Sequence, residues 1–208
     1  MLHVGTYEVI YRGQVVFNVG YVNKTHKISH KLREEMKHHG DLIVGDVKES
    51  FYTLSKKLSI GIDWLHRNLV FDFVLKTDDD VFINIPKVLK ALNTLPSHIQ
   101  YFGHVMWRQP VERKGRYKLT PDEFKHDRFD PYCSGGGFIV RQGVIEKIAW
   151  YLVFNRPLKY EDAYFGSLAF KAGVVPSKAY DKYFLMRNHK CIYHGRDVSI
   201  AQEWTLGV

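Results

Sequence analysis

Three consecutive carboxylates in the first half of the chain have the residue types and spacing best suited to chemistry. Asp78, Asp79 and Asp80 follow the apolar run 71–75 and Lys76, and they precede a second apolar run at 81–83. Adjacent carboxylates repel one another, so a fold holds three together only where positive charge compensates them. Their oxygens are ligands that suit Mg²⁺ or Mn²⁺. The pattern predicts a divalent-metal site at the end of a buried strand, with a solvated acidic turn as the simpler alternative.

A second candidate is the glycine run Gly135, Gly136 and Gly137, which adjoins an apolar stretch. Glycines permit a tight turn and let a backbone approach a ligand closely. The run matches neither the P-loop nor the dinucleotide-binding fingerprint. It indicates either a ligand-facing backbone or an ordinary β-bulge.

Two further acids, Glu161 and Asp162, stand at the start of a predicted helix. Acids in this position often do no more than compensate the helix dipole. The same position favours an ionised carboxylate, which a general base needs. A late histidine, His194, is one of 11 in the chain and carries little weight by itself.

The elements that must position these residues alternate between strand and helix patterns. Strands are predicted at 14–22, 41–44, 71–75, 99–103, 131–140 and 174–175, and helices at 28–39, 50–68, 87–95, 144–154, 161–172 and 198–204. Gly40 and Gly173 are placed to end helices, and Pro86 suits a first helical turn. Residues 107–128, with seven Lys/Arg and four Asp/Glu, are typical of a long exposed loop. The alternation indicates an α/β fold with a mainly parallel sheet.

The bulk composition sets limits on the kind of protein. At 208 residues and 45% hydrophobic residues, the chain suits one globular domain spanning 1–208. A net charge of +8 suits an anionic partner, but the basic residues are dispersed, so no nucleic-acid partner is expected. The sequence contains no run of the roughly 20 apolar residues that would span a membrane. Cys133 and Cys191 lack a C-x-x-C spacing, which leaves either a disulfide or two thiols.

Taken together, these motifs resemble a known family. The blocks K-T-D-D-D-V-F-I-N at 76–84, P-Y-C-S-G-G-G-F at 131–138 and E-D-A-Y-F-G at 161–166 occur in the order found in galactosyltransferase-type β1,3-glycosyltransferases (glycosyltransferase family 31). Residues 17–20 and 40–57 resemble earlier blocks of that family, and His194 with Trp204 resembles its late histidine block. The resemblance covers roughly residues 15–205.

The resemblance implies a GT-A fold, which is Rossmann-like with helices flanking a mainly parallel central sheet. It implies an inverting, Mn²⁺-dependent transfer of galactose or N-acetylglucosamine from a UDP-sugar to a glycan hydroxyl in β1,3 linkage, in protein or lipid glycosylation. It also implies a type II membrane protein of the Golgi lumen, whose anchor is absent from this chain.

Roles carry over by position in the matched blocks. Asp162 would be the catalytic base, with Glu161 as its neighbour or substitute. Asp80 and His194 would bind the metal. The residues implied to border the donor are Lys76, Asp78, Asp79, Gly135, Gly136 and Gly137.

Two other interpretations stay open. Residues 7–13 do not match the R-x-x-I/V-R-x-T-W block of the family, which leaves an inactive pseudo-transferase or carbohydrate-binding fragment as an alternative. Acid clusters also occur in metal-dependent phosphohydrolases. The sequence does not decide the donor sugar or the acceptor glycan.

Overall fold

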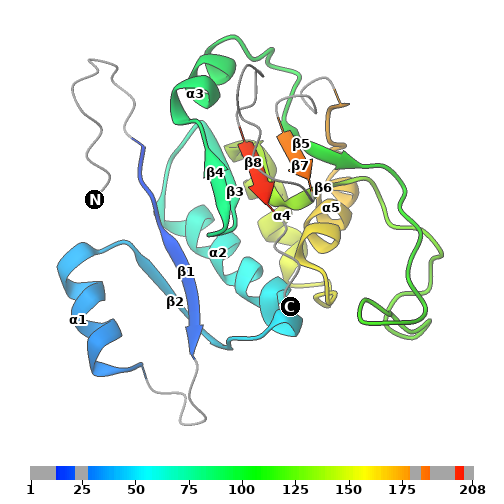
Figure 1. Cartoon of the computed structure of the whole chain (residues 1–208), viewed down its shortest axis with the longest axis horizontal. Coiled ribbons are helices and arrows are strands. Elements are labelled where there is room, and N and C mark those ends of the chain that lie inside the picture. The colour runs from blue at the N-terminus through cyan, green and yellow to red at the C-terminus, as the bar shows by residue number, and fades with distance from the viewer. Residues whose placement is uncertain (1–12, 22–27, 179–183, 188–199, 204–208) are drawn as a thin grey trace.

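The computed structural model describes residues 13–21, 28–178, 184–187 and 200–203 (Figure 1). The first part is a βαβ unit: β1 (Phe17–Tyr21) pairs in parallel with β2 (Leu42–Lys48), and α1 (His30–His39) lies in the connection. The Ser29 side chain caps the start of α1, and Gly40 ends it in the left-handed conformation, with φ 66°. The predicted helix and its glycine stop are confirmed.

The centre of the molecule is a three-stranded sheet in the order β3-β6-β5. It consists of β3 (Phe73–Thr77), β6 (Tyr132–Arg141) and β5 (Tyr101–Met106). A second three-stranded sheet has the order β4-β8-β7 and consists of β4 (Val81–Ile83), β8 (Ile200–Glu203) and β7 (Phe184–Arg187). In this second sheet β7 and β8 are parallel, and β4 and β8 are antiparallel.

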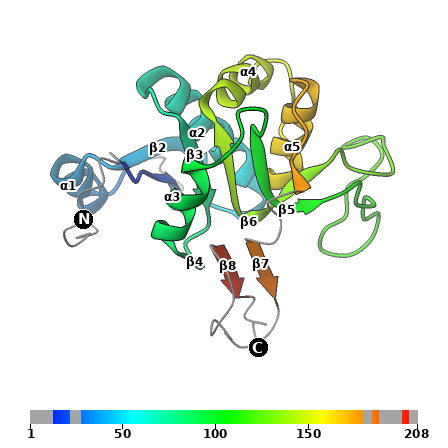
Figure 2. The same cartoon turned by 90° about the horizontal axis from the view of Figure 1, so that it is seen from above.

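Helices pack on both faces of the central sheet. They are α2 (Leu54–Asn68, preceded by the 3₁₀ turn η1, Phe51–Thr53), α3 (Ile85–Asn93), α4 (Gln142–Leu152) and α5 (Glu161–Lys171). Figure 2 shows α2, α4 and α5 on one side of this sheet and β7 and β8 on the other. Pro86 lies in the first turn of α3, as predicted, and the Asn84 side chain caps that helix. No helix within the described ranges is long and apolar enough to cross a membrane.

The structure does not confirm the expected mainly parallel central sheet, because β6 runs antiparallel to both β3 and β5. The expectation rested on continuous apolar runs, which arise wherever both faces of a strand are covered. Alternate residues here serve two clusters: Tyr101, Phe138 and Val140 join one, and Phe102 and Ile139 join the other. Burial on both faces therefore produces the same pattern in an antiparallel sheet.

Two predicted elements near the end of the chain are wrong. Residues 174–175 form no strand; the Val174 N–H bonds to the Ala169 carbonyl, and Ser177 makes a single parallel bridge to Phe102. The predicted helix 198–204 is contradicted by β8, which occupies 200–203. Short apolar segments do not distinguish helix from strand by periodicity, and here pairing with β4 and β7 decides the conformation.

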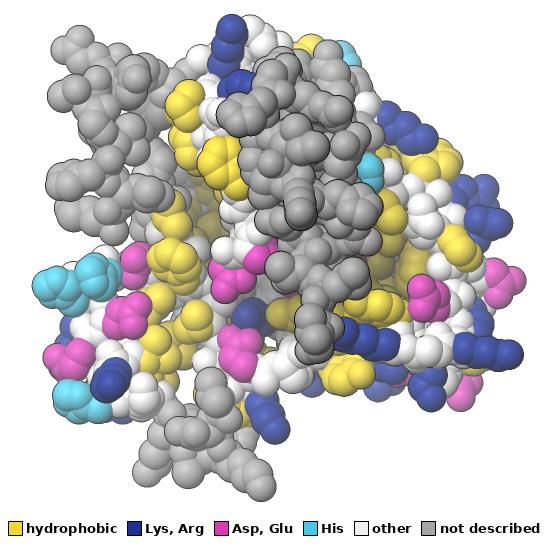
Figure 3. Space-filling view, viewed as in Figure 1, with side chains coloured by type: hydrophobic (Ala, Val, Ile, Leu, Met, Phe, Trp, Pro, Cys, Tyr) yellow, Lys and Arg dark blue, Asp and Glu magenta, His cyan; other side chains and the backbone are white. Residues whose placement is uncertain are grey.

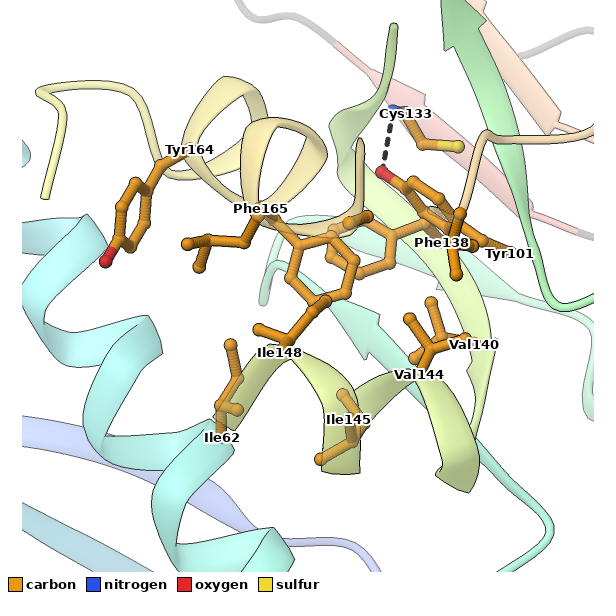
Figure 4. Close-up of a cluster of buried hydrophobic side chains, with 13 residues drawn as sticks. Ile62, Tyr101, Cys133, Phe138, Val140, Val144, Ile145, Ile148, Tyr164 and Phe165 are labelled. Carbon is orange, nitrogen blue, oxygen red and sulfur yellow. Dashed lines mark hydrogen bonds between the residues drawn. The ribbon is translucent and has the colours of Figure 1, made fainter. Parts of the chain in front are cut away.

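Acidic side chains gather over the turn between β3 and β4 in the space-filling view (Figure 3). Behind this surface lies the larger hydrophobic core, where Ile62, Ile148 and Phe165 meet residues of the sheet (Figure 4). The Tyr101 hydroxyl accepts a hydrogen bond from the Cys133 backbone N–H at 2.8 Å. The core therefore joins α2, α4 and α5 to β5 and β6, and it supports the strand end from which the acids project.

Residues 107–128 contain no helix or regular strand, as predicted, but the segment is held by contacts of its own. Leu119 is only 1% exposed and shares a cluster with Val111 and Phe129. The Arg113 guanidinium donates to the carbonyls of Leu119, Phe124 and His126 at 2.8–3.1 Å. Arg113 thus links three separate points of the loop. The loop packs against the start of α5, where Ala163 belongs to the same cluster.

Candidate active site

Lys76 brings three sequence motifs together. Its Nζ donates to Oδ1 of Asp78 at 2.6 Å, to the carbonyl of Gly135 at 2.7 Å and to the carboxylate of Glu161. These partners belong to the acid cluster after β3, the glycine run of β6 and the first turn of α5. The fold therefore places side by side the three blocks that the sequence singled out, although up to 85 positions separate them.

The charge on Lys76 is stabilised by its surroundings. Burial acts to lower the pKa of the Lys76 ammonium, but the attraction of Glu161 and Asp78 outweighs it and raises the pKa above the ordinary value. The ammonium therefore stays protonated at neutral pH. With three protein oxygens bound to it, Lys76 orders the site; the expected contact of Lys76 with a donor remains a prediction.

Asp162 is held by two backbone N–H groups. Its Oδ2 accepts from Gly135 at 3.2 Å, and its Oδ1 accepts from Ala163 at 2.7 Å. Burial raises the pKa of the Asp162 carboxyl, and the neighbouring Glu161 adds to this, whereas the two N–H groups and Lys76 oppose it. The net effect is a raised pKa. A raised pKa makes the carboxylate a better proton acceptor, and its orientation is fixed.

The glycine run lies within strand β6 and not in a tight turn. Gly103 pairs with Phe138 and Val105 with Cys133, so residues 134–137 lie opposite the single residue His104. This is a bulge, one of the two interpretations that the sequence allowed. Bulges next to active sites change the direction of the strand locally. Here the bulge contains Gly135, which contacts both Lys76 and Asp162.

The other two acids of the cluster, Asp79 and Asp80, lie exposed in the turn before β4. Exposed carboxylate oxygens are the donor type that a divalent cation such as Mn²⁺ accepts, so the residues present fit such an ion. Within the described part of the chain, no group of three or more His, Cys, Asp or Glu is placed to hold a metal. His194, the second expected ligand, lies outside the described residues, as do Cys191 and Trp204.

An aromatic cluster beside the acids was not recognised in the sequence. The ring of Tyr160, the residue before Glu161, lies 5.8 Å from the Tyr117 ring and 6.3 Å from the Phe51 ring. The Arg116 guanidinium lies over the Phe51 and Tyr117 rings, at 5.2 and 5.6 Å from their centroids. Two features of the sequence could have pointed to this cluster: Tyr160 directly precedes the acid pair, and the pair Arg116-Tyr117 lies within a polar loop.

Comparison with known protein families gives one match. The Galactosyltransferase family model matches residues 5–179. The chain therefore belongs to the galactosyltransferase family, as the resemblance of its motifs implied.

Three relatives illustrate the similarity. Lactosylceramide 1,3-N-acetyl-beta-D-glucosaminyltransferase A of Danio rerio is 31% identical over 211 residues, 92% of this chain and 55% of the relative. Beta-1,3-galactosyltransferase brn of Drosophila melanogaster is 27% identical over 169 residues, 78% of this chain and 51% of the relative. Beta-1,3-galactosyltransferase 2 of Mus musculus is 29% identical over 156 residues, 72% of this chain and 37% of the relative. The chain spans about half the length of the first two relatives.

Proposed function

We propose that residues 1–208 form one catalytic domain of an inverting β1,3-hexosyltransferase. It would move galactose or N-acetylglucosamine from a UDP-sugar to a hydroxyl of a glycan. The observation that carries the proposal is the convergence on Lys76 of the Asp78, Gly135 and Glu161 oxygens, with Asp162 oriented beside them. Family membership and the names of the relatives support the same reaction class.

Asp162 would act as the general base. In the proposed step its carboxylate takes the proton of the acceptor hydroxyl while that oxygen attacks the anomeric carbon of the donor. The bond from the anomeric carbon to the diphosphate breaks at the same time, and its electron pair leaves with UDP. Such proton transfer contributes typically about 10²–10⁴-fold. An ionised carboxylate has about four lone-pair sites, so the two bound N–H groups leave capacity for the incoming proton.

Glu161 would position other groups and not take the proton itself. Its Oε1 is bound to the Lys76 ammonium, and its side chain is only 14% exposed. Because Lys76 occupies Oε1, this oxygen is not available to an acceptor hydroxyl. We therefore assign the base to Asp162, and we assign Glu161 the role of holding Lys76 near the glycine bulge.

The donor would lie along the acid cluster and the bulge. Asp78 and Asp79 would face the nucleotide and Gly135, Gly136 and Gly137 the sugar, while Asp80 and His194 would hold Mn²⁺. When bound, this metal would neutralise charge that develops on the leaving diphosphate. The net charge of +8 suits a polyanionic donor.

The setting proposed for the whole protein is the Golgi lumen. The protein would be a type II membrane protein of that compartment. A glycan acceptor, on protein or lipid, and a UDP-sugar would be its partners, with no nucleic acid. The relatives named for lactosylceramide make lactose-type acceptors the first to try.

A donor screen tests the proposal. The purified chain is incubated with Mn²⁺ and either UDP-galactose or UDP-N-acetylglucosamine, with methyl β-lactoside or methyl N-acetyl-β-glucosaminide as the acceptor. We expect UDP release that depends on one donor and on an acceptor, with the disaccharide or trisaccharide product seen by mass spectrometry. UDP binding by calorimetry without any transfer would instead indicate a pseudo-transferase, and release of nucleoside monophosphate would indicate a phosphohydrolase.

A further inference from the structure

We propose that the loop 107–128 builds the acceptor subsite of this enzyme, with Tyr117 and Arg116 as its specificity-determining residues and with Phe51 and Tyr160 as its floor. The inference rests on the proposed transferase function and adds to it the residues that bind the acceptor sugar. The loop lies outside the three motif blocks, and its composition is that of an ordinary solvated segment.

The loop is built to hold a defined shape next to the base. Beyond the Arg113 contacts within the loop, Lys159 makes an ion pair with Glu123 at 2.8 Å. The Lys159 hydrogen bond, with the Thr120 N–H, lowers the pKa of Glu123 to about 2, so this pair stays charged over the physiological range. Lys159 is separated from Glu161 by one residue, so the ion pair fastens the loop to the segment that carries the acids.

The residues that meet between the loop and the start of α5 are aromatic residues and an arginine, which are side chains suited to binding a sugar. A pyranose ring has an apolar C–H face and a rim of hydroxyls, so an aromatic face with adjacent donors is complementary to it. Tyr117 and Tyr52 remain 38% and 57% exposed although both belong to this cluster. Arg116, which is exposed, places its five-donor guanidinium over the Phe51 and Tyr117 rings.

The Tyr160 hydroxyl supplies a second and independent indication. Its oxygen is buried and has no hydrogen-bond partner among the described residues. A buried polar atom left unpaired destabilises a fold, so such an atom calls for a ligand or water. Burial, with the nearby Glu112 and Tyr117, raises the pKa of Tyr160 to about 12, so this phenol is a neutral donor at neutral pH. A water or a sugar hydroxyl that reached this buried oxygen would satisfy it.

The position of the cluster favours the acceptor over the donor. Tyr160 directly precedes Glu161 and Asp162 in the chain, so its Cα lies about 3.8 Å from that of Glu161. The acceptor hydroxyl must come within hydrogen-bond reach of Asp162, so the rest of its sugar ring extends over neighbouring residues. The donor instead needs the acid cluster, where Asp78 is bound to Lys76.

Acceptor and donor kinetics of matched variants test the inference. Tyr117→Ala, Arg116→Ala and Tyr160→Phe are compared with two controls, Trp150→Ala, an aromatic residue 71% exposed on α4, and Lys125→Ala, an exposed cation of the same loop. We expect KM for methyl β-lactoside, or for whichever acceptor probe the wild type uses, to rise about tenfold in Tyr117→Ala. KM for the UDP-sugar and acceptor-independent UDP release should stay within twofold, and both controls should match the wild type.

A further variant separates loss of acceptor binding from loss of folding. Tyr117→Phe should retain acceptor binding if the ring face is what matters, and it guards against loss of folding in the alanine variant. An unchanged acceptor KM in Tyr117→Ala and Arg116→Ala, with the wild type active, would overturn this inference and leave the transferase proposal intact. A wild type that transfers no sugar to any probe would overturn both.

Discussion

Gly135 binds Asp162 through its backbone N–H, which donates to Oδ2 at 3.2 Å, and its carbonyl accepts from Lys76 at 2.7 Å. Both polar groups of one residue in the β6 bulge are thus used to orient site residues. A carboxylate held by backbone and not by mobile side chains is preorganised for the role of base that we propose, which would reduce the reorganisation needed in the reaction. The bulge and the site therefore depend on each other.

Removing the ammonium of Lys76 should damage both stability and activity. Lys76→Met leaves Glu161 partly buried without its cation, and breaking such pairs destabilises by about 3 kcal/mol. We expect a loss of that size in urea unfolding and almost no transfer. The control is Arg67→Met, which breaks an exposed pair with Asp63 and should change stability by less than about 0.5 kcal/mol. Equal effects of the two variants would refute a central role for Lys76.

Removing the charge of Asp162 should separate binding from turnover. Asp162→Asn keeps the side-chain volume but cannot accept the acceptor proton. We expect kcat to fall by about 10²–10⁴-fold while UDP affinity, measured by calorimetry with Mn²⁺, changes little. Glu161→Gln is the matched neighbour and should retain more turnover. Near wild-type turnover of Asp162→Asn would show that the base lies elsewhere.

The raised pKa of Asp162 also predicts a pH dependence of stability. The folded carboxyl binds its proton more tightly than the unfolded one, whose reference pKa is 3.8, so stability is lost as pH rises from about 4 through the folded pKa. The free energy of unfolding of the wild type should therefore fall relative to that of Asp162→Asn over this range. Urea titrations at several pH values measure the difference, and a trend of opposite sign would contradict the assigned shift. Protonation of Asp162 should also lower the rate of transfer toward acidic pH, because a protonated carboxyl cannot act as the proposed base.

Substitution by alanine should have different effects at two glycines of the contact between α5 and β6, Gly166 in the helix and Gly135 in the strand. A Cβ at Gly166 would lie 2.2 Å from the Cβ of Tyr132, whereas one at Gly135 would meet Asp162 and Glu161 at 3.6–3.7 Å, an ordinary contact. Gly166→Ala gains about 1 kcal/mol of helix propensity, but the clash outweighs it, and we expect a net loss of about 2 kcal/mol or more. Gly135→Ala should fold with near wild-type stability and lose transfer, because its methyl group adjoins both acids. Thermal unfolding and the transfer assay measure the two effects.

The proposed metal ligand in the acid cluster can be tested by binding. Asp80→Ala should weaken UDP affinity in the presence of Mn²⁺ by about tenfold or more, and EDTA should produce a similar loss in the wild type. Asp63→Ala, at a half-exposed acid of α2, serves as the control for the loss of a negative charge. If UDP binds Asp80→Ala and the wild type equally well with Mn²⁺, the ligand assignment is wrong.

The residues that define the motifs could be identified without coordinates, because each block combines unusual chemistry with a strong local pattern. Apolar runs on both sides of three acids predict a strand end, and a glycine after residue 39 predicts a helix stop; β3 and α1 bear out both. The three blocks at 76–84, 131–138 and 161–166 could be grouped only by their resemblance to a family. No local rule connects residues that lie so far apart.

The sequence by itself determined the family, most of the helices and strands up to α5, and the acids available for chemistry. The tertiary structure alone decided that the central strands run antiparallel, that Lys76 joins three motifs and that loop 107–128 carries Arg116 and Tyr117 to Tyr160. The physical reason is that strand direction and side-chain contact depend on which surfaces pack together. Apolar periodicity reports only that a face is buried, and it does not specify the partner that buries it.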